Sequence, residues 1–112
     1  MFKKKHSLTK RKLEAERIRS KYQGRVPVIV EAGSSCIYTL EKHKYLVPAD
    51  LTIGQFLYTI RNRLVLSADK ALFFFINNVI PPTSALMGQL DKENRDEDGF
   101  LYLVYNSEST FG

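Results

Sequence analysis

Apolar residues recur at helical spacing in a first stretch near the start of the chain. They form one stripe along the predicted helix, which consists of Leu8, Ala15, Ile18 and Tyr22. Lysine and arginine fill most of the other positions, a pattern typical of an amphipathic helix that packs one face on a core. Ser7 precedes the stripe and can cap the first turn through its hydroxyl. We therefore predict a basic helix over residues 8–22.

A second helical pattern follows in the middle of the chain. Its apolar positions recur at i, i+3, i+4, i+7 and i+11, and they are Ile53, Phe56, Leu57, Ile60 and Leu64. Thr52 and Gln55 stand three residues apart just before this run, which is the spacing of a capping box. The pattern predicts a helix that begins after Thr52 and buries one face.

Four short apolar runs predict strands. They are RVPVIVE (25–31), KYLV (44–47), LFFFI (72–76) and FLYLVY (100–105). The first run is apolar on both faces, which indicates a strand covered on two sides. Pro27 cannot donate to a ladder, so we place it near the start of that strand.

The segments between these elements are polar or carry turn residues. Residues 32–43 are a connection containing glycine and serine, NNVIPPTS is a turn, and SALMGQL (84–90) is a short helix. Residues 91–99, DKENRDEDG, are interpreted as a solvated acidic loop.

The predicted order after the first helix is β-β-α-β-(short α)-β. One long helix across a four-stranded mixed sheet is the β-grasp arrangement of ubiquitin, so the predicted fold class is α+β with a helical N-terminal extension. In this arrangement the first and last strands lie side by side at the centre. The strands at 44–47 and 72–76 would then form the two edges.

Composition limits the possible classes of protein. A chain of 112 residues with 44% hydrophobic content is sufficient for one packed domain. No apolar run approaches the roughly 20 residues that span a bilayer. Cys36 is the single cysteine and cannot form an internal disulfide, which fits a reducing compartment such as cytosol or nucleus.

Charge is distributed unevenly along the chain. Residues 1–25 carry ten Lys/Arg and two Glu, a balance of +8, whereas residues 26–112 carry seven Lys/Arg and ten Asp/Glu, a balance of −3. A basic arm on a mildly acidic body indicates an anionic partner: nucleic acid, an acidic protein or an anionic membrane. A solvated helix face is an equally simple interpretation. Nucleic acid is disfavoured because residues 3–21 contain no aromatic Phe, Tyr or Trp.

The sequence contains no recognisable catalytic constellation. His6 lies in the basic arm, His43 lies in a polar connection, and Cys36 has no partner that spacing would place beside it. Metal-protease, P-loop and Gly-x-Ser-x-Gly motifs are absent, and the acidic run at 91–98 lacks the spacing of a calcium loop. We expect neither an enzyme nor a metal or cofactor site.

Strand parity identifies two surfaces of interest. Phe73 and Phe75 would point to the side of the sheet opposite the long helix, where either the N-terminal helix covers them or they form an exposed patch. On the other edge, Lys44 and Leu46 face one way and Tyr45 and Val47 the other. A short apolar edge strand between a lysine and a proline can accept an added strand.

The stretches RVPVIVE, KYLVPADLTIGQF, ALFFFINNVIPPTSALMGQL and DEDGFLYLVY…STFG together resemble the autophagy-related ubiquitin-like modifiers, the family of the GABA-receptor-associated protein and microtubule-associated light chain three. The resemblance runs from about Glu14 to Gly112. It implies two N-terminal helices before a ubiquitin core. The implied parts are a basic helical extension (1–22), the core (23–105) and a flexible conjugation tail (106–112).

The same resemblance implies a function. Such a modifier is joined to phosphatidylethanolamine on autophagosomal membranes and recruits cargo receptors that carry an aromatic-x-x-aliphatic motif. Its partners are an activating enzyme, a conjugating enzyme and a cysteine protease. It is expected to be a cytoplasmic monomer that moves to the autophagosome membrane when lipidated.

The resemblance also assigns site residues. The first peptide pocket comprises Glu14, Ile18, Pro27, Ile29, Lys44, Leu46 and Phe100. The second peptide pocket comprises Tyr45, Val47, Pro48, Leu51, Phe56, Ile60 and Arg63. Acids flanking the motif would contact Arg25, Lys42 and Lys44. Gly112 is the conjugated residue, and Phe111, Phe73 and Phe75 would be recognised by the protease and the conjugation enzymes.

Three features depart from the family pattern. The 31–43 connection is about one residue short, Thr59 stands where an aliphatic residue usually lines the second pocket, and Asp91 replaces a usual aromatic. We expect Thr59, with a hydroxyl lacking an evident partner, to narrow or weaken the second pocket. The shortened 31–43 connection and Asp91 are expected to alter the surface read by partners. The alternative function is a ubiquitin-like module that is never conjugated and uses its basic N-terminus on tubulin or another anionic partner.

Overall fold

The computed structural model describes residues 1–34 and 36–107. Its elements in chain order are α1 (Phe2–Lys5), α2 (Leu8–Lys21), β1 (Arg25–Ala32), β2 (Lys44–Pro48), α3 (Ile53–Arg63), β3 (Phe73–Phe75), α4 (Met87–Asn94) and β4 (Leu101–Asn106). The order of predicted elements is confirmed, and the two helices before β1 agree with the family resemblance.

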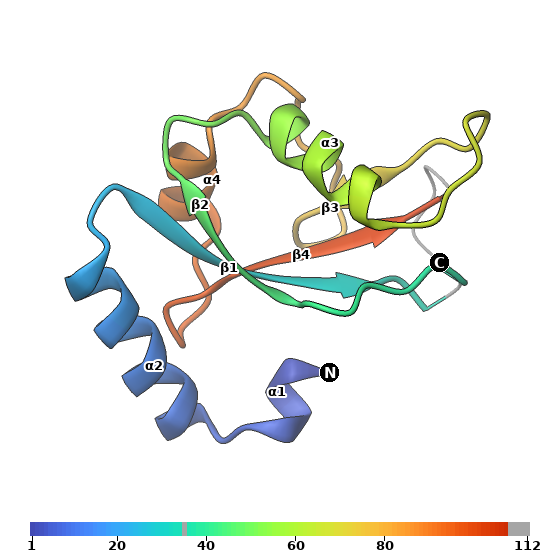
Figure 1. The fold of residues 1–112 in the computed structure, drawn as a ribbon. Helices are drawn as coiled ribbons and strands as arrows, with labels where there is room; N and C mark the ends of the chain where they lie inside the picture. Colours follow the sequence, from blue (N-terminus) through green and yellow to red (C-terminus); the bar gives the residue numbers. More distant parts are fainter. Residues whose placement is uncertain (35, 108–112) are drawn as a thin grey trace.

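The four strands form one mixed sheet in the order β2-β1-β4-β3. β1 pairs in parallel with β4, with Val28 opposite Leu101, and antiparallel with β2, with Val26 opposite Val47. β3 pairs antiparallel with β4 at the other edge. The predicted central pair and both predicted edge strands are therefore confirmed (Figure 1).

α3 covers one side of this sheet. The predicted capping box is present: the Thr52 hydroxyl accepts from the Gln55 backbone N–H at 3.1 Å, and the Gln55 side chain accepts from the Thr52 N–H at 2.9 Å. The apolar face of α3 packs with the inward residues of the strands and with α4. The main core includes Val26, Val28, Val30, Val47, Ile53, Phe56, Ile60, Leu72, Phe74, Ile76, Met87, Leu101, Leu103 and Tyr105.

α1 and α2 lie on the opposite side of the sheet (Figure 1). A second, smaller core there consists of Phe2, Ala15, Ile29 and Phe100, with Ile18 and Tyr102 packed against it. Burial on both faces explains why the β1 sequence is apolar throughout. The predicted stripe is buried at its middle, but Tyr22 at its end is exposed.

Close contact between α2 and the loop before β4 requires a glycine. Gly99 has φ +94°, and a Cβ added there would lie 2.8 Å from the Cβ of Ala15. Such a backbone conformation favours glycine, and the lack of a side chain lets the helix approach the loop.

The interpretation of residues 91–99 as a solvated acidic loop was wrong. Residues 91–94 continue α4, which ends at Asn94. Asp91 is 3% exposed and Asp98 is 1% exposed. Each carboxylate is buried because it pairs with an arginine of α2: Asp98 with Arg11 at 2.7 Å and Asp91 with Arg19 at 2.7 Å.

Candidate functional site

β2 presents an open edge next to a cavity. One side of β2 pairs with β1, and no strand among the described residues pairs with its other side. Along β2, Leu46 faces the α2 side of the sheet, whereas Tyr45 and Val47 pack toward α3. The unpaired N–H and C=O groups of such an edge can hydrogen-bond a further strand.

The cavity of about 250 Å³ lies between α2 and β2. It is lined by Glu14, Ile18, Tyr22, Pro27, Lys42, Lys44, Tyr45, Leu46 and Phe100. Six of the seven residues predicted for the first peptide pocket are thus brought together. The seventh, Ile29, is fully buried in the core beneath α2 and does not line the cavity.

An ion pair joins the two walls of this cavity. The Lys44 ammonium on β2 lies 2.7 Å from the Glu14 carboxylate on α2, and both side chains are partly exposed. Lys44 also lies 5.8 Å from the centre of the Phe2 ring. The cavity is therefore an apolar pocket with a charged rim, a combination suited to an aromatic side chain next to a polar backbone.

The residues predicted for the second pocket meet between β2 and α3. Val47, Phe56 and Ile60 are buried and can form only its floor, while Tyr45, Pro48, Leu51 and Arg63 reach the surface. The Tyr45 ring packs edge-on against Phe56 with 5.6 Å between centroids, and the Arg63 guanidinium lies 5.6 Å from the Tyr45 ring. Burial raises the pKa of Tyr45 and the positive charge of Arg63 lowers it, and the net effect is an increase.

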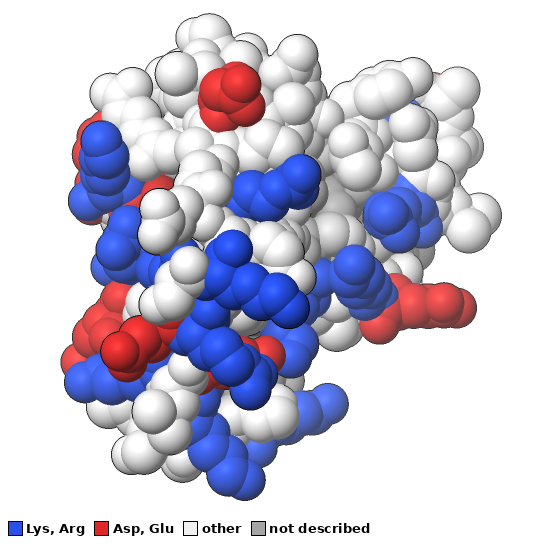
Figure 2. All heavy atoms as spheres, turned by 60° about the vertical axis from the view of Figure 1, so that its left-hand side comes forward, with Lys and Arg blue, Asp and Glu red and all other residues white. Residues whose placement is uncertain are grey.

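Basic residues surround both pockets. Arg25, Lys42 and Lys44 are exposed, as required for contacts to acids flanking a motif, and the Lys42 ammonium lies 5.2 Å from the Tyr45 ring. Lysine and arginine gather over the lower half and across the middle of this face, whereas its upper part is mainly uncharged (Figure 2).

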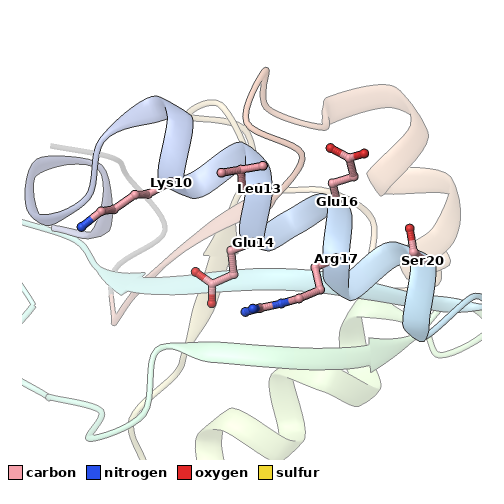
Figure 3. Close-up of a pocket in the computed structure, with 6 residues that line it drawn as sticks. All are labelled: Lys10, Leu13, Glu14, Glu16, Arg17 and Ser20. Carbon is pink, nitrogen blue, oxygen red and sulfur yellow. The ribbon is translucent and has the colours of Figure 1, made fainter.

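The outer surface of α2 borders the first pocket. A broad hollow of about 730 Å³ is lined by Lys10, Leu13, Glu14, Glu16, Arg17 and Ser20. Figure 3 shows Glu14 and Arg17 pointing from α2 toward β2, whereas Glu16 points away. Leu13 is 63% exposed among these charged neighbours. The mixed charges of this hollow select no single ligand.

The residues predicted to be recognised by the protease and the conjugation enzymes lie away from both peptide pockets or outside the described residues. Phe75 is 2% exposed and Phe73 is half-buried, and neither belongs to the small core under the N-terminal helices as far as the described residues go. We expected the two phenylalanines either to be covered by the N-terminal helix or to form an exposed patch. Neither expectation is met by the pair as a whole. Phe111 and Gly112 lie outside the described residues.

Two expectations about single residues need correction. Asp91 is not part of the surface, because it is buried beneath arginines. Thr59 is exposed, but its hydroxyl has a partner: it donates to the Gln55 carbonyl at 3.3 Å. A threonine hydroxyl on a helix commonly donates a hydrogen bond to the backbone carbonyl one turn earlier. The prediction of a hydroxyl without a partner was therefore wrong.

A buried polar network next to the first pocket was not predicted from the sequence. Asp98 accepts from the Arg11 guanidinium at 2.7 Å, the Tyr102 hydroxyl at 2.5 Å and the Phe100 backbone N–H at 2.8 Å. Burial and the Asp98 carboxylate raise the pKa of Tyr102, and the Asp98 hydrogen bond raises the pKa of Arg11. Phe100 lines the pocket, so the network fixes one wall. The excess of bases in residues 1–25 and of acids in residues 91–98 was its only signal.

Two further kinds of site, a metal centre and a membrane-spanning helix, are absent from the described residues. No three His, Cys, Asp or Glu side chains in this part of the chain lie close enough to hold a metal ion. None of the helices in it combines the length and the apolar character needed to cross a membrane.

The sequence matches one family of known proteins. The profile of the family described as "Autophagy protein Atg8 ubiquitin like" matches residues 10–112. The Emericella nidulans protein "Autophagy-related protein 8" is 58% identical over 112 residues, covering 99% of this chain and 95% of that protein. The protein of the same name from Neurospora crassa is also 58% identical over 112 residues, covering 99% of this chain and 93% of that protein.

Solved structures show the same similarity. The crystal structure of Trypanosoma brucei ATG8 matches with a TM-score of 0.90 and 39% identity, covering 99% of this chain and 97% of that chain. Plasmodium falciparum Atg8, solved in complex with an Atg3 peptide from the same organism, matches with a TM-score of 0.89 and 34% identity, covering 97% of both chains.

Proposed function

Because this chain belongs to the Atg8 family of ubiquitin-like autophagy proteins, we propose that it is a modifier with two activities. Its C-terminal Gly112 is joined to phosphatidylethanolamine on autophagosomal membranes. Its β2 edge then recruits cargo receptors and autophagy factors that carry an aromatic-x-x-aliphatic motif. The unlipidated form is a cytoplasmic monomer, and lipidation moves it to the membrane.

The single observation that carries the recruitment activity is the open β2 edge beside an apolar cavity. A peptide strand added along Lys44–Pro48 gains main-chain hydrogen bonds, and its side chains alternate between the two faces of the sheet. An aromatic side chain of the motif fits the cavity between α2 and β2. An aliphatic side chain fits the surface between β2 and α3, over Val47 and Phe56.

The placement of the two proposed sites supports one direction for the bound peptide. The cavity for the aromatic residue lies toward Lys44 and Leu46, and the surface for the aliphatic residue lies toward Pro48 and Leu51. The motif therefore runs in the same direction as β2. Residues before the aromatic pass Lys42 and Lys44, whose ammonium groups favour acids. Two small pockets and a few strand hydrogen bonds correspond to roughly micromolar affinity, about −8 kcal/mol.

The lipidation activity depends on the end of the chain. Gly112 has no Cβ to obstruct a narrow catalytic channel, and two acyl chains make a stable membrane anchor. An activating enzyme and a conjugating enzyme would carry the Gly112 carboxylate as thioesters, and a cysteine protease would expose or release it. Support for a conjugating-enzyme partner comes from the Plasmodium relative bound to an Atg3 peptide. Phe111, Phe73 and Phe75 are the proposed recognition residues.

Reconstitution tests both activities separately. The full chain, its matching enzymes, ATP and phosphatidylethanolamine liposomes should yield a lipidated product that floats with the liposomes. Deletion of Gly112 should abolish this product without weakening peptide binding. As the matched control, Leu46→Asp should abolish peptide binding and leave lipidation intact. Lipidation of the Gly112-deleted chain would refute the conjugation proposal.

One observation favours the alternative of an anionic partner for the N-terminus. Six cations of α1 and α2 form no ion pair with described residues: Lys4, Lys5, Lys10, Lys12, Arg17 and Lys21. Binding of the Gly112-deleted chain to microtubules should then fade as salt rises from 50 to 300 mM, because exposed charges are screened within about 10 Å at 0.1 M. Undetectable binding at low salt would refute this second function.

A further inference from the structure

Asp91 occupies a buried position where α2, α4 and the loop before β4 meet. Its two carboxylate oxygens accept from both terminal nitrogens of Arg19, at 2.9 and 2.7 Å. Arg95, one turn later on the same segment, donates to it at 2.8 Å. Paired geometry of this kind fixes the plane of a guanidinium as well as its position.

Arg19 is held by a second acceptor as well. Its Nε and Nη2 donate to the Gly99 carbonyl at 2.9 and 2.7 Å. At the same point Ala15 of α2 lies so near Gly99 that no Cβ fits between them. The C-terminal half of α2 therefore has a fixed height above the loop and little freedom to shift.

Asp91 is itself fixed by the main core. Met87 and Leu90, earlier in α4, are buried among the residues beneath α3. Rigid contacts thus run from the core through α4 to Asp91, and from Asp91 through Arg19 to α2. The side chain next to Arg19 is Ile18, and Glu14 stands one turn earlier. Both line the cavity between α2 and β2.

We propose that Asp91 is a positioning residue for the first peptide pocket, which holds the α2 wall at the spacing that an aromatic side chain requires. This inference rests on the proposed recruitment of aromatic-x-x-aliphatic peptides. Asp91 touches no ligand, and its effect passes through Arg19 to Ile18 and Glu14. The affinity of this chain for aromatic motifs is therefore set partly by a carboxylate that does not line the pocket.

If Asp91 had only a structural role, a different result would be expected. Loss of the carboxylate would then lower the free energy of unfolding and leave the affinity of the folded protein unchanged. A positioning role instead couples Asp91 to one position of the peptide, the aromatic. Double-mutant cycles between protein and peptide measure this coupling directly.

The experiment uses the full chain and three synthetic peptides: a parent with Trp-x-x-Leu, a second with Trp→Ala and a third with Leu→Ala. Dissociation constants are measured by NMR titration, which reaches the weak binding of the second and third peptides. Asp91→Asn is the test variant, because it is isosteric and removes the charge. Asp96→Asn is the matched control, since Asp96 pairs with Lys3 of α1, which does not line the pocket.

We expect Asp91→Asn to raise the dissociation constants of the parent peptide and the Leu→Ala peptide about 5-fold. Its dissociation constant for the Trp→Ala peptide should equal that of the unmodified chain. Asp96→Asn should bind all three like the unmodified chain. Arg19→Lys should repeat the Asp91→Asn pattern, because lysine lacks the planar two-pronged contact, and it carries the test if Asp91→Asn does not fold. Equal weakening of all three peptides, or none, would overturn the inference. If the unmodified chain bound no peptide, the proposed recruitment activity itself would be refuted.

Discussion

Arg11 and Asp98 form a buried ion pair across 87 positions of sequence, with 2.7 Å between the guanidinium nitrogen and the carboxylate oxygen. It joins α2 to the loop that leads into β4. The same carboxylate accepts from the Tyr102 hydroxyl and from the backbone N–H of Phe100, and Phe100 lines the first pocket. The pair ties the N-terminal extension to the ubiquitin-like core.

Removing this carboxylate should cost a large part of the stability of the fold. Asp98→Ala leaves a buried guanidinium, a phenol and a backbone N–H without their acceptor, and we expect a loss of about 3 kcal/mol in the free energy of unfolding. Urea denaturation followed by circular dichroism measures it. Asp96→Ala is the control: it removes a partly exposed pair with Lys3 and one hydrogen bond from the Asp98 backbone N–H, and it should cost less, about 1 kcal/mol. Equal losses for the two variants would contradict the expectation.

Acid should weaken the protein partly through Asp91. Burial raises the pKa of this carboxyl, but the hydrogen bonds from Arg19 and Arg95 outweigh burial and hold the pKa below its ordinary value. Its contribution is therefore complete above the unfolded pKa of about 4 and is lost as pH falls through the lower folded pKa. Unfolding free energies measured from pH 7 to pH 2 should fall less steeply below pH 4 for Asp91→Asn than for the unmodified chain. Parallel pH curves would rule this out.

Leu46 should be essential for peptide recruitment. A charged side chain at this position would be desolvated against Pro27 and Phe100 when an aromatic residue enters the cavity, so Leu46→Asp should abolish binding. Amide chemical-shift mapping is the measurement, and the shifts in the unmodified chain should follow Lys44–Pro48. Shifts confined to Phe73–Phe75 would place the peptide on the opposite edge of the sheet.

Thr59 should limit the apolar contact at the aliphatic site. It lies on the turn of α3 between Phe56 and Arg63, and it is exposed. Thr59→Leu should tighten binding of a motif peptide by ~1 kcal/mol, about fivefold in Kd, through added apolar burial. The lost hydrogen bond to Gln55 is exposed and should matter little. Calorimetry tests this, and unchanged affinity for Thr59→Leu would refute it. The control is Tyr58→Leu, because Tyr58 is exposed and lies about 160° around α3 from Phe56.

The parts of the fold predicted from sequence depend on short-range patterns. The capping box needs only Thr52 and Gln55, and the burial of α3 follows from a periodicity that repeats within one helix. Strand parity predicted that Leu72, Phe74 and Ile76 would enter the core beneath α3, and they do. Membership of a ubiquitin-like family also confirms that the chain is not an enzyme, as the lack of catalytic motifs indicated.

The parts that were missed depend on contacts between distant residues. Asp91 and Asp98 belong to a run of charges, and charges in such a run are usually solvated. Their burial depends on Arg19 and Arg11, which stand 72 and 87 positions away. Nothing in the local spacing pairs these residues. One of these pairs, Arg19 with Asp91, involves the part of α4 that composition alone assigned to a loop.

The parallel pairing of β1 with β4 determines when the protein can fold. The central ladder needs Val28 and Leu101 together, and α2 needs Asp91 and Asp98 to hold it, so neither the sheet nor the extension can be completed until the final third of the chain exists. A nascent chain that grows at about 5–20 residues per second therefore exposes the apolar β1 segment for several seconds before its neighbour is made. Contacts of such long range also slow the search for the native state. Arg11 and Arg19 of α2 should consequently act late in folding, and their substitution should change the unfolding rate more than the folding rate.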